Sequence, residues 1–182
     1  MPNNIYNEVI VIDLEATCWD IAEEKVANTS EIIEIGICVL NVFNGEISKP
    51  AGLIIKPCQS KISPFCEQLT TITQDMVDAG MSFEDALAIL KADYGVGNRM
   101  MAAYGNYDKT MLTRQCTNYA VKPMFGPTYL NISAMATLKL KANKRLGLKS
   151  AMTGFGLTFD GTPHRGVDDA VQAARVLWEI IR

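Results

Sequence analysis

Two carboxylates follow a hydrophobic run near the start of the chain and are candidates for metal-ion chemistry. Asp13 and Glu15 come after the apolar residues 9–12, and strand alternation puts both side chains on the same face. Two carboxylates this close repel each other unless a cation lies between them, and hard divalent cations prefer oxygen ligands. Taken alone, the pair is equally well interpreted as solvated acids at a strand edge.

Another acid and the only histidine of the chain lie further along. Asp108 follows a short apolar run and opens a predicted helix, where by itself it is best interpreted as an acid that complements the helix dipole. His164 lies in a polar loop before Asp169, and by itself it is best interpreted as solvated surface. Histidine also exchanges protons near neutral pH, which suits a general base. Together with Asp13 and Glu15, these are the parts of a two-metal phosphoryl-transfer site.

Helical periodicity distinguishes the neighbours Asp168 and Asp169. Steps of three and four residues from Asp169 reach an apolar stripe: Ala173, Val176 and Ile180. The same steps from Asp168 reach polar side chains: Gln172, Arg175 and Glu179. We therefore expect Asp169 to face a sheet and Asp168 to face solvent or the helix N-terminus.

The elements that must position these residues begin with strand patterns and then alternate. Strands are expected at residues 9–14, 31–43 and 47–56, with a hairpin signal at Asn44-Gly45 and a loop at 20–30. Short strands are expected near 100–104 and 129–132. Helices are expected at 73–78, 82–92, from Tyr107, around Met135, at 148–155 and at 168–181. This order predicts an α/β fold with a mixed five-stranded sheet, an antiparallel meander of strands 1–3 followed by strands 4 and 5, flanked by helices.

Length and charge limit the class of protein. The 182 residues fit a single domain spanning 1–182, and the net charge of -3 argues against a generally basic nucleic-acid-coating surface. Five cysteines without a Cys-x-x-Cys pair argue against a zinc site or a disulfide framework and favour a reducing compartment. No leader or membrane span is expected. We therefore expect a soluble cytoplasmic protein without membrane association.

These motifs resemble the DEDDh branch of the DnaQ-like 3′→5′ exonucleases. That branch has Asp-x-Glu, then Asp after an aromatic residue, then His with Asp five positions later. Here the pattern reads as Asp13-Leu14-Glu15, Tyr107-Asp108, and His164 with Asp169. The runs DLEATCW at 13–19, EIIEIG at 31–36, LTTIT at 69–73 and PHRG at 163–166 are similar to one sub-branch. It includes KapD and the eukaryotic histone-mRNA 3′ exoribonucleases.

The resemblance implies an RNase H-like fold and a set of site residues. It implies metal ligands for two Mg²⁺ or Mn²⁺ ions at Asp13, Glu15, Asp108 and Asp169, with His164 as general base. The backbone around Ala16 and Thr17 would hold the terminal 3′-hydroxyl, while Trp19 and Leu69 pack on the last base. Core packing is the other interpretation of those two side chains. The implied substrate-binding residues are Ala16, Thr17, Trp19, Leu69, Thr70, Tyr104 and Tyr107.

The implied activity is removal of nucleoside 5′-monophosphates from single-stranded RNA or DNA 3′ ends. The choice between RNA and DNA stays open, and so does a homodimer. A non-catalytic module of the same fold that binds nucleic-acid ends or a protein is the alternative, and an endonuclease of the broader fold is a weaker one. The chain departs from many relatives at Asn106, where they carry a second acid, so metal preference or affinity can differ.

Overall fold

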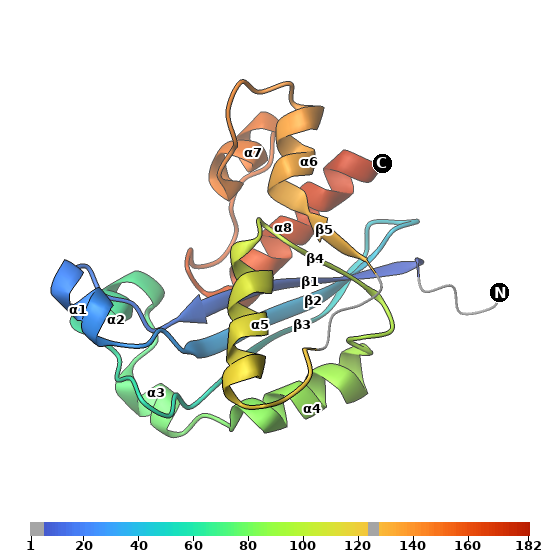
Figure 1. Cartoon of the computed structure of the whole chain (residues 1–182). Coiled ribbons are helices and arrows are strands. Elements are labelled where there is room, and N and C mark those ends of the chain that lie inside the picture. Colours follow the sequence, from blue (N-terminus) through green and yellow to red (C-terminus); the bar gives the residue numbers. More distant parts are fainter. Residues whose placement is uncertain (1–5, 124–127) are drawn as a thin grey trace.

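The fold is built on a mixed sheet with helices on both faces, as seen in a computed structural model that describes residues 6–123 and 128–182 (Figure 1). The strand order is β3-β2-β1-β4-β5. Strands β1–β3 pair antiparallel, whereas β4 is parallel to both β1 and β5. The strands run as follows: β1 Glu8–Ala16, β2 Ile32–Asn41, β3 Ile47–Ile54, β4 Met100–Ala103 and β5 Tyr129–Asn131. This is the predicted meander followed by two further strands.

Helices divide between the two faces and the ends of the sheet. Their bounds are α1 Ala22–Ala27, α2 Pro64–Thr70, α3 Gln74–Asp78, α4 Phe83–Tyr94, α5 Tyr107–Asn118, α6 Ile132–Lys139, α7 Leu148–Gly154 and α8 Gly166–Ile181. One face packs against α4 and α5, and the other packs against α6, α7 and α8. Figure 1 shows α1 and α2 beyond the end of β1. Among the described residues, no helix combines the length and hydropathy that crossing a bilayer requires.

Strand β1 is buried on both faces, which explains its unbroken apolar pattern. Ile10, Ile12 and Leu14 join the core against α4 and α5. Val9 and Val11 join the core against α6, α7 and α8. Because side chains alternate along a strand, the odd-numbered Asp13 and Glu15 continue the second face. The end of β1 therefore presents both carboxylates toward α8.

Two elements differ from the sequence predictions. The expected loop at residues 20–30 contains helix α1, which has no buried residue, so no apolar periodicity marked it. Helix α2 was not predicted, although Ser63 caps the amide of Cys66 and Pro64 occupies the first turn. Both helices are short, and their stability depends on neighbouring segments more than on local pattern. Residues 1–5, part of the segment in which no leader was expected, lie outside the described residues.

Gln172 belongs to the polar face of α8 that periodicity predicted, but its side chain is buried. This side chain is 2% exposed, and its amide nitrogen donates to the carbonyl of Asp160. Arg175 donates to the carbonyl of Thr158 at 2.9 Å and to the amide oxygen of Gln172 at 2.6 Å. The segment before the His164 loop therefore covers this face of α8. A polar side chain can be buried where a backbone carbonyl satisfies it.

Candidate active site

Three carboxylates from two distant segments of the chain converge at the end of β1. Asp13 and Glu15 of β1 and Asp169 of α8 each offer an oxygen, and these oxygens lie within 4.8 Å of one another. Asp108, in the first turn of α5, is buried and accepts a hydrogen bond from the amide of Leu14 at 3.0 Å. Because Leu14 separates Asp13 from Glu15, this bond brings the fourth acid to the same strand end. The four predicted ligands therefore form one cluster.

The surroundings of these four carboxyl groups disfavour their charged forms. Burial raises the pKa of Asp13 well above its usual value, and the charges of Asp108 and Glu15 add to this effect. Burial followed by the charge of Asp169 raises the pKa of Glu15 to about 8. The pKa values of Asp108 and Asp169 are also raised, mainly by burial. Because all of the donors are oxygen atoms and their charges repel, the residues suit hard divalent cations.

The loop before α8 places His164 beside the cluster. The His164 backbone has a left-handed φ of 62°, and its amide donates to a carboxylate oxygen of Asp169 at 2.6 Å. This backbone region is uncommon for a residue other than glycine, so the contacts of the loop hold it in place. The exposed His164 side chain lines a cavity together with Asp169. The imidazole is thus held where solvent and a substrate can reach it.

Asp168 takes a different position from its neighbour. Its carboxylate accepts a hydrogen bond from the amide of Thr162 at 2.8 Å, and it is not among the three converging acids. The facing of Asp169 toward the sheet agrees with the prediction from periodicity. Asp168 thus lies outside the three converging acids, in the first turn of α8, which is the helix N-terminus named in the prediction.

A buried acid on β2 holds the start of α8 against the sheet. The Glu34 side chain is fully buried, accepts from the amide of Gly166 at 2.8 Å, and pairs with the Arg165 guanidinium at 3.3 Å. A Cβ built on Gly36 would lie 1.8 Å from the carbonyl carbon of Gly166, so the two backbones touch. This contact brings Asp169 to Asp13. Sequence reasoning missed Glu34 and Arg165, although an acid within an apolar strand is itself a signal.

The end of β1 and the residues that follow it lie beside a different cavity. Ala16 and Thr17 are buried, and the amide of Thr17 donates to the carbonyl of Glu31 at 2.8 Å. Thr17 and Trp19 line a cavity of about 470 Å³ that also contains Lys25 and Arg114. Aromatic and cationic side chains in one hollow suit a nucleotide, whose base stacks and whose phosphate is negative.

The other predicted substrate residues lie on separate elements. On α2, Leu69 is half-buried, whereas Thr70 is buried and its hydroxyl donates to the carbonyl of Cys66 at 2.8 Å. The Tyr104 hydroxyl donates to the carbonyl of Leu146 at 3.1 Å. Tyr107 is 56% exposed and directly precedes Asp108. The Tyr107 ring is therefore free to contact a ligand beside the carboxylates.

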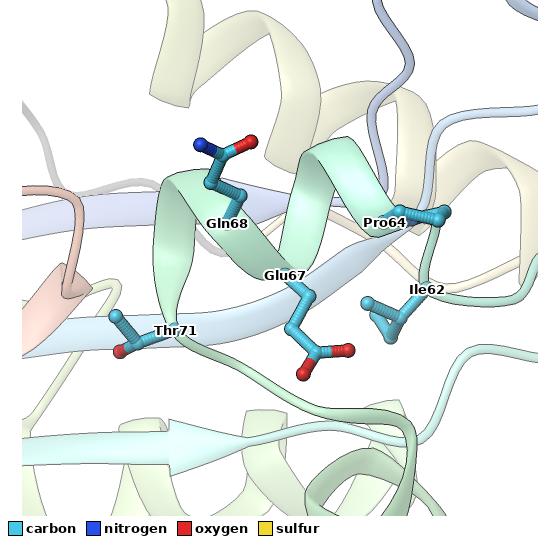
Figure 2. A pocket seen from close by; sticks show the side chains of 5 residues that line it. All are labelled: Ile62, Pro64, Glu67, Gln68 and Thr71. Atoms are coloured by element: carbon cyan, nitrogen blue, oxygen red, sulfur yellow. The ribbon is translucent and has the colours of Figure 1, made fainter.

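A more open hollow lies on the outer side of α2 and contains none of the four carboxylates. Its volume is about 630 Å³, and it is lined by Ile62, Pro64, Glu67, Gln68 and Thr71. Figure 2 shows the Glu67 and Gln68 side chains pointing to different sides of the helix. Polar groups do not converge there, so its size does not make it the reactive site.

Cation binding should stabilise this cluster in a pH-dependent way. A carboxyl whose pKa is raised by folding contributes stability below its unfolded pKa and loses it as pH rises through the folded value. With chelator present, we expect the melting temperature to fall between about pH 5 and about pH 8, where Glu15 ionises. Millimolar Mn²⁺ should raise the melting temperature at the upper pH by binding only the folded form. Thermal unfolding monitored by circular dichroism measures both effects.

The Asp13→Ala variant should blunt the Mn²⁺ effect. Asp93→Ala is a matched control, because Asp93 is an exposed acid near the end of α4. It should keep the full increase in melting temperature. An unchanged melting temperature on adding Mn²⁺ to the parent protein would contradict an assembled cation site.

Comparison with known proteins places this geometry among nucleases. Residues 10–177 match the family model RNase_T, described as exonuclease. ERI1 exoribonuclease 2 of Xenopus laevis is 31% identical over 202 residues, covering 97% of this chain and 28% of that protein. The 3′-5′ exoribonuclease 1 of Rattus norvegicus is 28% identical, covering 96% of this chain and 53% of that protein. The chain thus spans about half or less of these two relatives' lengths.

A solved structure shows the same architecture. The nuclease domain of 3′hExo, described as a DEDDh family member bound to rAMP, superposes with a TM-score of 0.86 at 28% identity. The likeness covers 95% of this chain and 90% of that domain. The expected RNase H-like fold is thereby confirmed.

Proposed function

This chain belongs to the exonuclease family, and we propose that it is a metal-dependent 3′→5′ exonuclease acting on single-stranded RNA or DNA. It would release nucleoside 5′-monophosphates. The observation that carries the proposal is the convergence of Asp13, Glu15 and Asp169, with Asp108 bound to the intervening amide and His164 beside them. A module that only binds nucleic-acid ends has no need of a general base next to four acids.

The residues divide the chemistry between charge and proton transfer. Two divalent cations, Mg²⁺ or Mn²⁺, would supply stabilisation of the attacking and leaving oxygens when held by Asp13, Glu15, Asp108 and Asp169. The His164 imidazole would take the proton from the attacking water. Asp169 has a further task, because its carboxylate holds the His164 amide and so fixes the loop that carries the base. The ion pair of the buried Glu34 with the partly exposed Arg165 would keep that loop at the sheet.

We place the terminal nucleotide on the side of Thr17 and Trp19. The 3′-hydroxyl would lie near the backbone of Ala16 and Thr17, and the last base would contact Trp19 and Leu69. The cavity of about 470 Å³ at Thr17 and Trp19 supports this placement, since Thr17 follows Glu15 by two residues. The exposed Tyr107 ring offers a further face for stacking. Roles for Thr70 and Tyr104 stay predictions.

Asn106 bears on which metal ion the site prefers and how tightly it binds that ion. The Asn106 side-chain oxygen accepts from the side-chain nitrogen of Asn131 at 3.1 Å. A neutral residue thus stands where the family resemblance implies a second acid. We expect this to change metal preference or affinity more than the chemistry.

The five cysteines are free thiols, which favours a reducing compartment such as the cytoplasm. Assembly as a homodimer stays a prediction.

Product polarity tests the proposed activity. A single strand labelled at its 5′ end should yield a ladder of shortening products with Mg²⁺ or Mn²⁺ and none with EDTA. A 3′-phosphate should slow the reaction strongly, because its charge and bulk clash where the 3′-hydroxyl is held. Denaturing electrophoresis of matched RNA and DNA strands measures both effects. It also measures the preference for ribose or deoxyribose.

The control substrate is a circular single strand of the same sequence. It has no 3′ end and should survive. Cleavage of the circle at the rate of the linear strand would assign the site to an endonuclease and contradict the proposal.

A further inference from the structure

A second cavity borders the acidic cluster from another set of elements. Its volume is about 320 Å³, and it reaches the cluster at Asp169 and the proposed base at His164. Its other walls come from α7 and its start, and from the loop before α8: Gly147, Leu148, Lys149, Ser150, Phe159 and Pro163. The Thr17–Trp19 cavity instead draws on the segment after β1, on α1 and on α5. One cavity thus contains Asp169 itself, whereas the other is lined by residues that begin two positions after Glu15.

The chain beside this second cavity is basic, although the protein is acidic overall. The net charge is -3, yet no Asp or Glu occurs from residue 109 to residue 159. Lys144, Arg145 and Lys149 follow one another closely before and within the first turn of α7. A local run of cations without acids is the charge pattern of a phosphate-binding surface.

Arg145 ties this basic run to the catalytic end of the sheet. Its guanidinium donates to the Ser133 hydroxyl at 3.1 Å. It also lies 3.0 Å from the position a Cβ would take on Gly105, in the turn that leads to Asp108. Arg145 therefore lies at the turn before Asp108, and Lys149 lies at the cavity that contains His164.

Lys149 is the cation in this run that lines the cavity. It is exposed, and within the described residues it forms no ion pair. Phe159 is half-buried and contributes an apolar wall to the same cavity. A cation and an aromatic ring in one hollow suit a nucleotide, because a phosphate is held by charge and a base by stacking.

We infer that this cavity binds the second nucleotide from the 3′ end, with Lys149 contacting its phosphate. The inference rests on the proposed function. If the terminal nucleotide lies on the Thr17–Trp19 side and the scissile phosphodiester lies at the carboxylates, the next nucleotide must leave on another side of the cluster. The cavity at His164 adjoins the cluster there, and the run at Lys144 and Arg145 continues it. The strand upstream of the cut would follow these cations.

Binding measurements separate this subsite from the terminal one. Lys149→Gln removes the cation, and Lys91→Gln is the matched control, because Lys91 is an exposed helical lysine on α4, across the sheet from α7. Fluorescence anisotropy with a single-stranded decamer, in Ca²⁺ to suppress cleavage, gives the affinity for a strand. Calorimetric titration with 5′-AMP gives the affinity of the terminal site. Cleavage of the decamer by the parent protein in Mn²⁺ is measured alongside.

Lys149→Gln should weaken decamer binding about tenfold, the order expected of one charge-assisted contact. It should also reduce the salt slope of log affinity by about 0.7, as for one phosphate contact on a single strand. The affinity for 5′-AMP should not change, and Lys91→Gln should change the affinity for neither ligand.

Two results would overturn the subsite. One is decamer affinity unchanged by Lys149→Gln while the parent protein cleaves the decamer, which removes the subsite and leaves the exonuclease in place. The other is an equal loss for 5′-AMP, which assigns Lys149 to the terminal nucleotide or to the fold. A parent protein that neither binds nor cleaves the decamer would instead refute the proposed function, and the subsite with it.

Discussion

Asp169→Asn is expected to lower single-turnover cleavage at least about a hundredfold, as for loss of a ligand in a two-metal site. Its carboxylate lies within 4.8 Å of the oxygens of Asp13 and Glu15, and it also accepts from the amide of His164. The substitution thus removes a negative charge from the proposed cation site and replaces the acceptor that holds the His164 amide. Asp168→Asn should lose far less, because its carboxylate accepts from the amide of Thr162 and is not among the three converging acids.

The two variants are close to a matched pair. Each replaces an acid by its amide isostere in the first turn of α8, so both remove the same charge near the same helix end. Single-turnover rates with excess protein, together with Mn²⁺ affinity, distinguish ligand loss from a general weakening of the helix. An inactive Asp168→Asn beside an active Asp169→Asn would refute both the facing of the helix and the family alignment.

His164→Ala is expected to lower the same rate by about a hundredfold or more, the usual size of general-base help. Mn²⁺ binding should survive. The histidine reaches the cluster through its backbone amide, which alanine retains, and it is not among the three converging acids. Loss of rate with retained metal affinity would separate the proton-transfer role from the ligand role.

The left-handed backbone at residue 164 calls for a second variant. Alanine at a φ of 62° is strained, so His164→Asn, which tolerates this region better, checks that the loop is intact. Both variants should lose the base, and both should show the increase in melting temperature with Mn²⁺. If either variant keeps the parent rate, His164 is not the base.

Much of the fold followed from local pattern. The apolar run of β1 predicted a strand, because a strand covered on both faces carries little else. The Asn44-Gly45 pair was expected between two strands, and β2 and β3 do pair on either side of it. Asp13 and Glu15 share a face because strand alternation is fixed by backbone geometry. The facing of Asp169 followed from helical periodicity for the same kind of reason.

Other features depended on neighbours that no local pattern names. Helix α1 has no buried residue and therefore no apolar stripe to reveal it. Gln172 is buried because the carbonyl of Asp160, twelve residues away, satisfies its amide. The charge pattern from residue 109 to residue 159 was visible in the sequence, but its meaning required the cavity that Lys149 lines.

The sequence by itself predicted which residues carry the chemistry, and alternation and periodicity set the facing of Asp13, Glu15 and Asp169. Only the tertiary structure decided that residues 13, 108 and 169 meet. The contact of Gly36 with Gly166 and the ion pair of the buried Glu34 with Arg165 bring α8 onto the sheet. Burial then raises the pKa values of the four acids, and burial is a property of the packed molecule. Periodicity fixes the direction of a side chain, whereas distance and desolvation depend on contacts between segments far apart in the chain.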